Sequence, residues 1–173
     1  WDYDIASAPN LVDIVVDGRP IKAVAQVSKT AFTYVFDRIT GEPVWPIEER
    51  PVAASTVPGE RTHPTQPFPT KPAPFDRQGI SEDDLIDFTP EIAEAARELA
   101  SEFVLGPIFT PPIVRGSNGK RATFVVPGAG GGANFPGATV DPETGILYVP
   151  SATRPNGMSL VEPPEGTSDW PYV

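Results

Sequence analysis

Proline and glycine constrain this chain more than any other feature of its sequence. Its 173 residues include 23 prolines and 15 glycines, which exceeds average usage and shows no collagen-like period. Proline removes a backbone donor and fixes one dihedral angle, whereas glycine adds the conformational freedom that tight turns need. The composition therefore favours short strands joined by many turns and by long irregular segments.

Short strands are expected in the first fifty residues. Residues 11–16 (LVDIVV) and 21–27 (IKAVAQV) flank an Asp-Gly pair at 17–18, which is a strong hairpin signal. Residues 30–36 (TAFTYVF) are rich in β-branched and aromatic side chains, and they predict the next strand. With a further short strand expected around residues 44–45, the region predicts an antiparallel meander.

One stretch of the sequence occurs twice. Residues 36–46 (FDRITGEPVWP) align without gaps on residues 140–150 (VDPETGILYVP). Each copy carries Asp-x-x-Thr-Gly, in which the aspartate can cap a turn and the glycine can adopt a positive φ. A repeated strand-turn-strand step predicts the blades of a β-propeller, where four-stranded sheets are arranged radially.

A long insertion at residues 51–110 separates the two copies. Its first part, 51–74, is too rich in proline for a strand ladder and is expected to be extended. Ser81 is expected to cap a short acidic turn, and Thr89, followed by Pro90, is expected to begin a helix. An apolar stripe at helical spacing is expected to pack this helix onto the chain: Ile92, Ala95, Ala96, Leu99 and Phe103.

The bulk composition excludes several classes of function. A formal net charge of −10 leaves no basic surface for nucleic acid, whose phosphates require Lys and Arg. The absence of cysteine excludes disulfides and thiolate metal sites. No apolar run approaches the roughly 20 residues of a membrane-spanning helix.

Several stretches together resemble the pyrroloquinoline quinone (PQQ) dependent dehydrogenases, especially the membrane-type glucose dehydrogenase branch. They occur in family order and cover nearly the whole chain: WDYD, KTAFTYVFDRITGEPVWPIEERPV, PTQPFPTKP, GPIFTPP and GGGANFPGATVDPETGILYV. The resemblance implies an all-β fold, part of an eight-bladed β-propeller. This chain is expected to supply about two blades, each an antiparallel meander, at residues 1–50 and 111–173, around the Pro-rich and helical insertion at 51–110.

The resemblance also assigns roles to particular residues. Asp2 matches the general base that removes the alcohol proton, Lys29 the lysine that hydrogen-bonds the PQQ oxygens, and Asn134 an asparagine of the PQQ pocket. Asp4, and Asp2 with it, are candidate ligands of a calcium ion, and a lanthanide is the alternative because related methanol dehydrogenases pair an aspartate at this spacing with lanthanides. The family's glutamate and asparagine metal ligands are expected upstream of this chain. The chain is therefore expected to be an internal fragment that is inactive without the rest of the parent propeller.

The resemblance implies a parent enzyme that oxidises an alcohol or a sugar and passes electrons to a respiratory quinone. It implies a periplasmic location, with the parent anchored in the inner membrane. Without the resemblance, Asp2 and Asp4 read as a solvated strand end, Lys29 as a solvated lysine, and Asn134 as a turn residue. The competing functional hypothesis is a non-catalytic β-propeller used as a scaffold or binding protein, because fold alone does not determine function.

Overall fold

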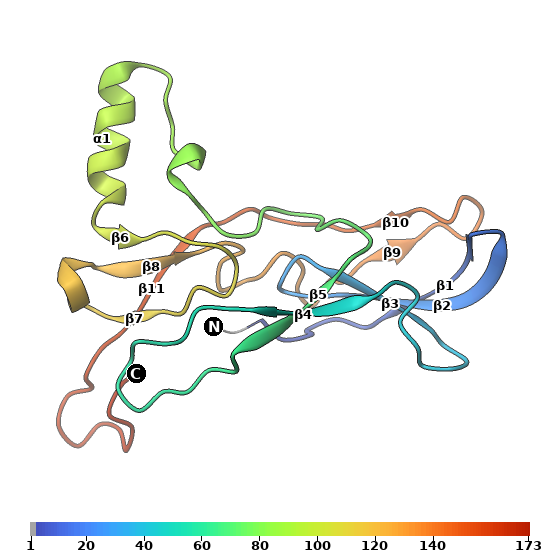
Figure 1. Ribbon diagram of the computed structural model, residues 1–173, viewed down its shortest axis with the longest axis horizontal. Coiled ribbons are helices and arrows are strands. Elements are labelled where there is room, and N and C mark those ends of the chain that lie inside the picture. The colour runs from blue at the N-terminus through green and yellow to red at the C-terminus, as the bar shows by residue number, and fades with distance from the viewer. Residues whose placement is uncertain (1–2) are drawn as a thin grey trace.

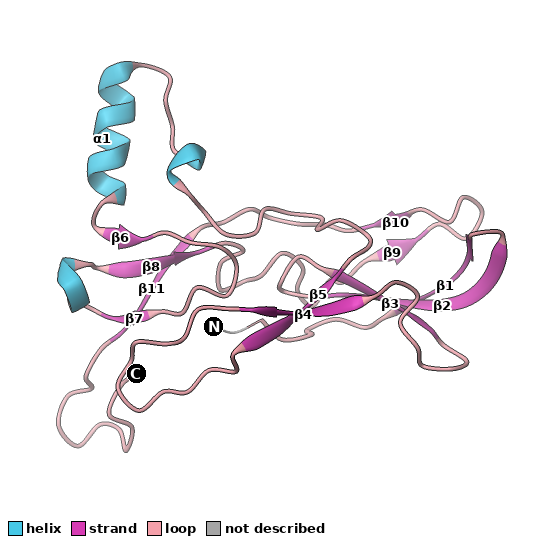
Figure 2. Ribbon diagram, in the orientation of Figure 1, coloured by secondary structure: helices cyan, strands magenta, loops and turns pink. Residues whose placement is uncertain are grey.

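Residues 3–173 are described from a computed structural model, so the predicted base Asp2 lies outside the described residues. Short strands and loops dominate, and the described part of the chain contains one α-helix (Figure 2). The described part of the chain is therefore mainly β, as the sequence predicts.

The first sheet is the predicted antiparallel meander, in the order β1-β2-β3. Its strands are β1 (Asn10–Val16), β2 (Arg19–Val27) and β3 (Thr33–Asp37). The hairpin between β1 and β2 turns at Asp17 and Gly18, which have φ values of 50° and 76°. Two successive positive φ values match the twist of a two-residue hairpin, and this is why Asp-Gly is favoured there.

The predicted third strand is shorter than its sequence indicates. Residues 30–32 form a turn instead of extending β3, and Ala31 adopts a φ of 66°. The prediction of a strand around residues 44–45 is also wrong. This segment makes one isolated bridge, between Phe36 and Pro43, and one bond from the Val44 N–H to the Val35 carbonyl at 2.9 Å.

The two Asp-x-x-Thr-Gly copies form matching turns. In the first, the Gly41 N–H donates to the Asp37 carbonyl at 2.8 Å, and Gly41 has a φ of 81°. In the second, the Gly145 N–H donates to the Asp141 carbonyl at 2.8 Å, and Gly145 has a φ of 71°. The turn prediction is thus confirmed at both positions, because the aspartate and the glycine perform the same backbone task.

The second turn connects β9 (Thr139–Val140) to β10 (Leu147–Tyr148). This short hairpin lies beside β1 of the first sheet (Figure 1). Leu147 packs against the buried side chains of Ala23, Ala25 and Val35. The two copies of the repeat, over 100 residues apart in the sequence, therefore share one apolar core.

A second, four-stranded sheet has the order β6-β8-β11-β7. Its strands are β6 (Phe103–Val104), β7 (Ile113–Val114), β8 (Ala122–Val125) and β11 (Asn156–Leu160). Strands β8 and β11 are antiparallel, whereas β6-β8 and β11-β7 are parallel. This mixed sheet is not the simple meander expected for residues 111–173, and the division of the chain into blades stays a prediction.

The proline-rich part of the insertion does form a ladder, contrary to expectation. Strand β4 (Ile47–Pro51) pairs with β5 (Thr65–Pro69). At the ladder ends the Val52 N–H donates to the Pro64 carbonyl and the Thr70 N–H donates to the Pro46 carbonyl. Hydrogen-bonded and non-hydrogen-bonded pairs alternate along an antiparallel ladder. Counted from these two bonds, Pro51, Pro67 and Pro69 fall at non-hydrogen-bonded positions, where the backbone nitrogen faces away from the partner strand. Their missing N–H groups therefore cost no ladder bond.

The helix is confirmed, but its expected packing is wrong. Helix α1 (Pro90–Ala100) begins after Thr89, whose hydroxyl accepts the Ile92 N–H at 3.3 Å. It stands away from the sheets (Figure 1), and the apolar stripe is largely exposed, with Ile92 at 40% and Leu99 at 56%. Ala93 and Ala100 are the buried residues of the helix. The stripe therefore forms no core among the described residues.

Two 3-10 turns complete the fold, at Glu82–Asp84 and Ser117–Gly119. Ser81 precedes the first of them, and its N–H donates to the Asp84 carboxylate at 2.8 Å. Within residues 3–173, no helix has the length and apolar character needed to cross a membrane.

Candidate functional site

The turn between β2 and β3 holds the residue on which the predicted site depends. The Ser28 N–H donates to the Phe32 carbonyl and the Ala31 N–H donates to the Ser28 carbonyl, each at 3.1 Å. The hydroxyls of Ser28 and Thr30 lie 2.5 Å apart inside the turn. All five residues from Ser28 to Phe32 are buried, so the intervening Lys29 is carried into the interior.

Lys29 is a buried cation with a carboxylate beside it. Only 8% of the residue is exposed, and its Nζ lies 2.6 Å from Oδ1 of Asp4. The backbone reinforces this pair, because the Lys29 N–H donates to the Asp4 carbonyl at 3.4 Å. A buried ammonium is costly without such a partner, and Asp4, with its side chain 59% exposed, supplies one from the rim.

A glycine-rich loop packs directly on the Lys29 turn. The Gly132 N–H donates to the Lys29 carbonyl at 2.8 Å, and the Ala133 N–H donates to the Ser28 carbonyl at 3.3 Å. A Cβ on Gly131 would lie 2.4 Å from Cβ and Cγ of Lys29 and 2.5 Å from its Cα. Gly131 also has a φ of 72°. Only glycine allows the loop to approach the lysine this closely.

We expect Gly131→Ala to push the loop away from Lys29 and to destabilise the protein by a few kcal/mol, because strain at positive φ adds to a backbone clash. Gly130→Ala is the matched control, since a Cβ there meets nothing within 4 Å. Chemical denaturation of the full-length protein measures both variants. Equal stability of the two would contradict the close approach described here.

Residues 75–78, in the middle of the insertion, close the other side of the turn. The Phe75 N–H donates to the Ala31 carbonyl at 3.0 Å, and Nε2 of Gln78 donates to the Thr30 carbonyl at 2.7 Å. Three distant segments thus hold one turn: the residues near Asp4, the glycine-rich loop and residues 75–78.

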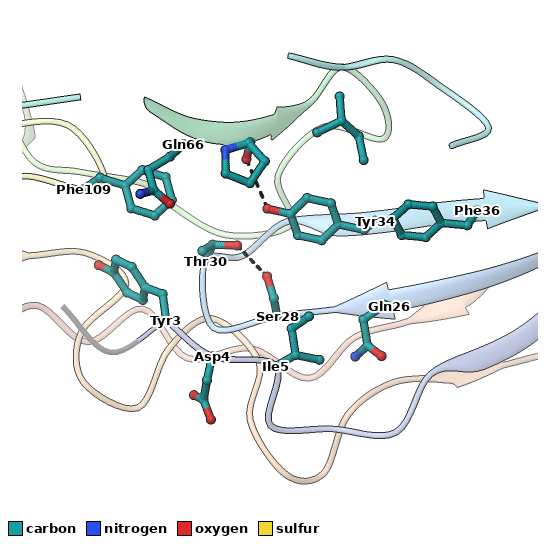
Figure 3. A pocket seen from close by; sticks show the side chains of 12 residues that line it. Tyr3, Asp4, Ile5, Gln26, Ser28, Thr30, Tyr34, Phe36, Gln66 and Phe109 are labelled. Atoms are coloured by element: carbon teal, nitrogen blue, oxygen red, sulfur yellow. Dashed lines mark hydrogen bonds between the residues drawn. The ribbon is translucent and has the colours of Figure 1, made fainter. Parts of the chain in front are cut away.

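Ser28 and Thr30 also face a cavity of about 650 Å³ (Figure 3). Aromatic rings form much of its surroundings, and Phe68 and Phe109 pack edge to face at 5.6 Å between ring centroids. The Tyr3 hydroxyl donates to the Pro127 carbonyl at 2.7 Å, and burial raises the pKa of Tyr3 to about 12. Tyr3 is therefore a neutral hydrogen-bond donor at physiological pH.

The sequence analysis did not predict this aromatic cavity. Its signal is the alternation of aromatic residues at 32, 34 and 36 within the predicted strand 30–36, since alternate residues of a strand share a face. Tyr34 and Phe36 line the cavity, and Phe32 packs edge to face on Tyr34 at 6.1 Å. Its apolar walls and few hydroxyl groups are typical of a site for a small organic molecule.

Asn134 lies in the same glycine-rich loop as Gly131, beside a second cavity of about 550 Å³. Its Nδ2 donates to the Gly130 carbonyl at 2.9 Å, and its Oδ1 accepts the Phe135 N–H at 2.8 Å. Both ends of the amide therefore bond to the loop's own backbone, as in a turn residue. The contact of Asn134 with PQQ stays a prediction. The next residue, Phe135, is 85% exposed.

The described residues fit a quinone cofactor better than they fit a complete metal site. A buried ammonium beside a loop of glycines suits the oxygens of an anionic quinone. Calcium takes six to eight oxygen ligands, but residues 3–173 bring together no group of three acidic or histidine side chains that could hold a metal ion. Asp4 offers one carboxylate that is already paired with Lys29, and its role as a metal ligand stays a prediction.

Comparison with known proteins places these features in a family. The PQQ family described as "Glucose/ethanol/alcohol dehydrogenase, beta-propeller domain" matches residues 1–170. The glycerol dehydrogenase large subunit of Gluconobacter oxydans is 33% identical over 85% of this chain and 19% of its own length. The quinoprotein glucose dehydrogenase of Escherichia coli is 33% identical over 93% of this chain and 19% of its own length.

A third relative, the quinate/shikimate dehydrogenase (quinone) of Acinetobacter baylyi, is 29% identical over 86% of this chain and 18% of its own length. The chain thus spans about a fifth of the length of the curated relatives it matches. No solved structure matches it. The match from residue 1 to residue 170 is nevertheless continuous, and the chain belongs to the PQQ family of glucose/ethanol/alcohol dehydrogenase β-propeller domains.

Proposed function

We propose that this chain is part of a PQQ-dependent dehydrogenase that oxidises a CH–OH group of an alcohol or an aldose. The observation that carries the proposal is the burial of Lys29 between Asp4 and the glycine-rich loop. A cation is costly to bury, and this one is held by backbone bonds from two other segments. The family relationship supplies the chemistry that such a cation serves.

In the proposed reaction, three residues of this chain have assigned roles. Asp2 takes the proton of the substrate hydroxyl as general base, which makes it easier for hydride to leave the carbon. When bound, PQQ would accept that hydride, and with it the two electrons of the oxidation. Lys29 stabilises the negative charge that develops on the cofactor oxygen, and its fixed position avoids reorganisation during the reaction. Asn134 contributes to the wall of the cofactor pocket.

The finer assignments are proposals that the relatives and the family resemblance support. The names of the relatives include glycerol, glucose and quinate dehydrogenases, so the proposed substrate is a small polyol, sugar or alcohol. The proposed metal is calcium, with a lanthanide as the alternative, and its remaining ligands come from the rest of the parent propeller. The proposed acceptor is a respiratory quinone, and the proposed location is periplasmic, with the parent anchored in the inner membrane.

Reconstitution of the full-length protein tests this function. The apoprotein is mixed with PQQ and Ca²⁺, and dye reduction is followed with glucose, glycerol, quinate and ethanol as substrates. We expect PQQ-dependent reduction with at least one of them, and no reduction by residues 1–173 alone. A full-length protein that binds no PQQ, measured by quenching of tryptophan fluorescence, would instead support the non-catalytic scaffold.

A further inference from the structure

Asp76 connects two segments that are far apart in the sequence. Its carboxylate accepts hydrogen bonds from the hydroxyls of Ser151 and Thr153, which lie 75 and 77 residues later in the chain. It also accepts the Arg77 N–H at 2.7 Å. The guanidinium of Arg77 pairs with Asp84 at 3.4 Å. Hydroxyl and amide donors therefore surround the Asp76 carboxylate, and it acts as an acceptor that joins loops.

These bonds stabilise the ionised form of Asp76. Partial burial acts to raise the pKa of Asp76, but the hydrogen bonds from Ser151, Thr153 and the Arg77 N–H outweigh it and lower the pKa below its ordinary value. Hydrogen bonds to an ionised carboxylate are stronger than bonds between neutral groups. The hydrogen bonds that join Asp76 of the insertion to Ser151 and Thr153 are therefore of this charged, stronger type.

The same link reaches the Lys29 turn by two routes. Oγ of Ser151 also lies 2.8 Å from the Gly132 carbonyl, and the Gly132 N–H donates to the Lys29 carbonyl. On the other side of Asp76, its neighbour Phe75 donates to the Ala31 carbonyl. Asp76 thus connects the two segments that hydrogen-bond the backbone of the Lys29 turn, namely the glycine-rich loop and residues 75–78.

We propose that Asp76 is a positioning residue for Lys29. By fixing residues 151–153 and the glycine-rich loop against residues 75–78 of the insertion, it sets the depth at which the Lys29 ammonium is held. This inference rests on the proposed role of Lys29 toward PQQ. It assigns Asp76 a function in cofactor affinity without direct contact with the cofactor.

Two substitutions at Asp76 in the full-length protein test the proposal. Asp76→Ala removes every acceptor, and we expect the Kd for PQQ to rise about tenfold, the size typical of groups that orient a ligand-binding residue. Asp76→Asn keeps one oxygen acceptor and can donate to Ser151 Oγ, which leaves the Ser151 proton for the Gly132 carbonyl. We therefore expect Asp76→Asn to retain most of the affinity, measured by quenching of tryptophan fluorescence.

Asp141→Ala separates positioning from general stability. Asp141 also accepts a hydroxyl, from Thr144 at 2.8 Å, and an N–H, from Glu143 at 2.9 Å, but its turn joins β9 to β10 beside β1. We expect it to lower the unfolding temperature while leaving the Kd for PQQ unchanged. If Asp141→Ala weakened PQQ binding as much as Asp76→Ala, the effect would be structural and the proposal would be wrong.

Milder variants keep the test decisive if Asp76→Ala does not fold. Ser151→Ala removes the hydroxyl that contacts both Asp76 and Gly132, whereas Thr153→Ala removes a bond to Asp76 alone. We expect Ser151→Ala to weaken PQQ binding more than Thr153→Ala does. Unchanged affinity in both folded variants would overturn the proposal.

Lys29→Ala distinguishes the failure of this inference from the failure of the proposed function. Weaker PQQ binding in Lys29→Ala, with normal binding in the Asp76 and Ser151 variants, would overturn only the positioning role. Unchanged PQQ binding in Lys29→Ala would contradict the proposed role of Lys29, and the role of Asp76 would fall with it.

Discussion

Replacement of Lys29 by alanine in the full-length protein is expected to lower PQQ-dependent dye reduction by roughly 10²–10³-fold, the loss seen when a preorganised charge-stabilising group is removed. The variant loses the cation that faces the developing negative charge and leaves the Asp4 carboxylate without the ammonium 2.6 Å away. The measurement is kcat at saturating PQQ and substrate, so that weaker cofactor binding does not enter the comparison.

Two further lysine variants show whether position or charge matters. Lys22→Ala is the matched control, because this lysine lies on β2, the strand that leads into the Lys29 turn, but is exposed, and its removal is expected to leave kcat unchanged. Lys29→Arg keeps the charge but adds bulk where the glycine-rich loop is in close contact. We expect it to recover only part of the activity. A wild-type rate in Lys29→Ala would exclude the proposed role of this residue.

Replacement of Asp2 by asparagine is expected to lower kcat by about 10²–10⁴-fold, the usual contribution of a general base. Asparagine is similar in size but cannot accept the hydroxyl proton, so the substrate and PQQ should still bind. Stopped-flow measurement of the reduction of bound PQQ by substrate follows this step directly.

Asp4→Asn is the natural comparison, since Asp4 lies two residues away and pairs with Lys29. We expect a smaller loss of kcat and a weaker hold on Lys29, seen as a higher Kd for PQQ. If Asp4→Asn abolished turnover while Asp2→Asn remained active, the assignment of the base to Asp2 would be wrong.

Features set by neighbouring residues could be predicted from the sequence. The Asp17-Gly18 hairpin, the two Asp-x-x-Thr-Gly turns and the Thr89 cap each depend on the chemistry of a few consecutive residues. Their side chains and φ preferences decide the local backbone with little help from the rest of the fold. The structure confirms all of them.

Features that depend on distant partners could not be predicted in this way. The turn from Ser28 to Phe32 replaces a strand with good β propensity, because bonds from Phe75, Gln78 and Gly132 hold its carbonyls. Tertiary contacts of this kind override local preference. Exposure of the α1 stripe was equally out of reach, since periodicity identifies an apolar face but not what lies against it.

Part of the candidate site was also beyond residue-level reasoning. The role of Lys29 at the cofactor is implied by the family resemblance, whereas its pairing with Asp4 is a finding of the structure. Nothing about Asp76 in the sequence sets it apart from the other acids of an acidic chain. Its bonds to Ser151 and Thr153 form only when the fold brings together residues that are 75 and 77 positions apart in the sequence.

The β4–β5 ribbon has a consequence for the solution behaviour of the protein. The outward-facing positions of β5 are Thr65, Pro67 and Pro69, and the two prolines have no N–H. The Thr65 N–H donates to Nδ1 of His63 at 3.3 Å, and the Pro67 carbonyl accepts the Tyr34 hydroxyl at 3.2 Å. A free strand edge normally invites pairing with a strand of another molecule, and proline removes the donors on which such pairing depends. The prolines that make this segment look unfit for a sheet are thus expected to disfavour pairing with a strand of another molecule along the β5 edge.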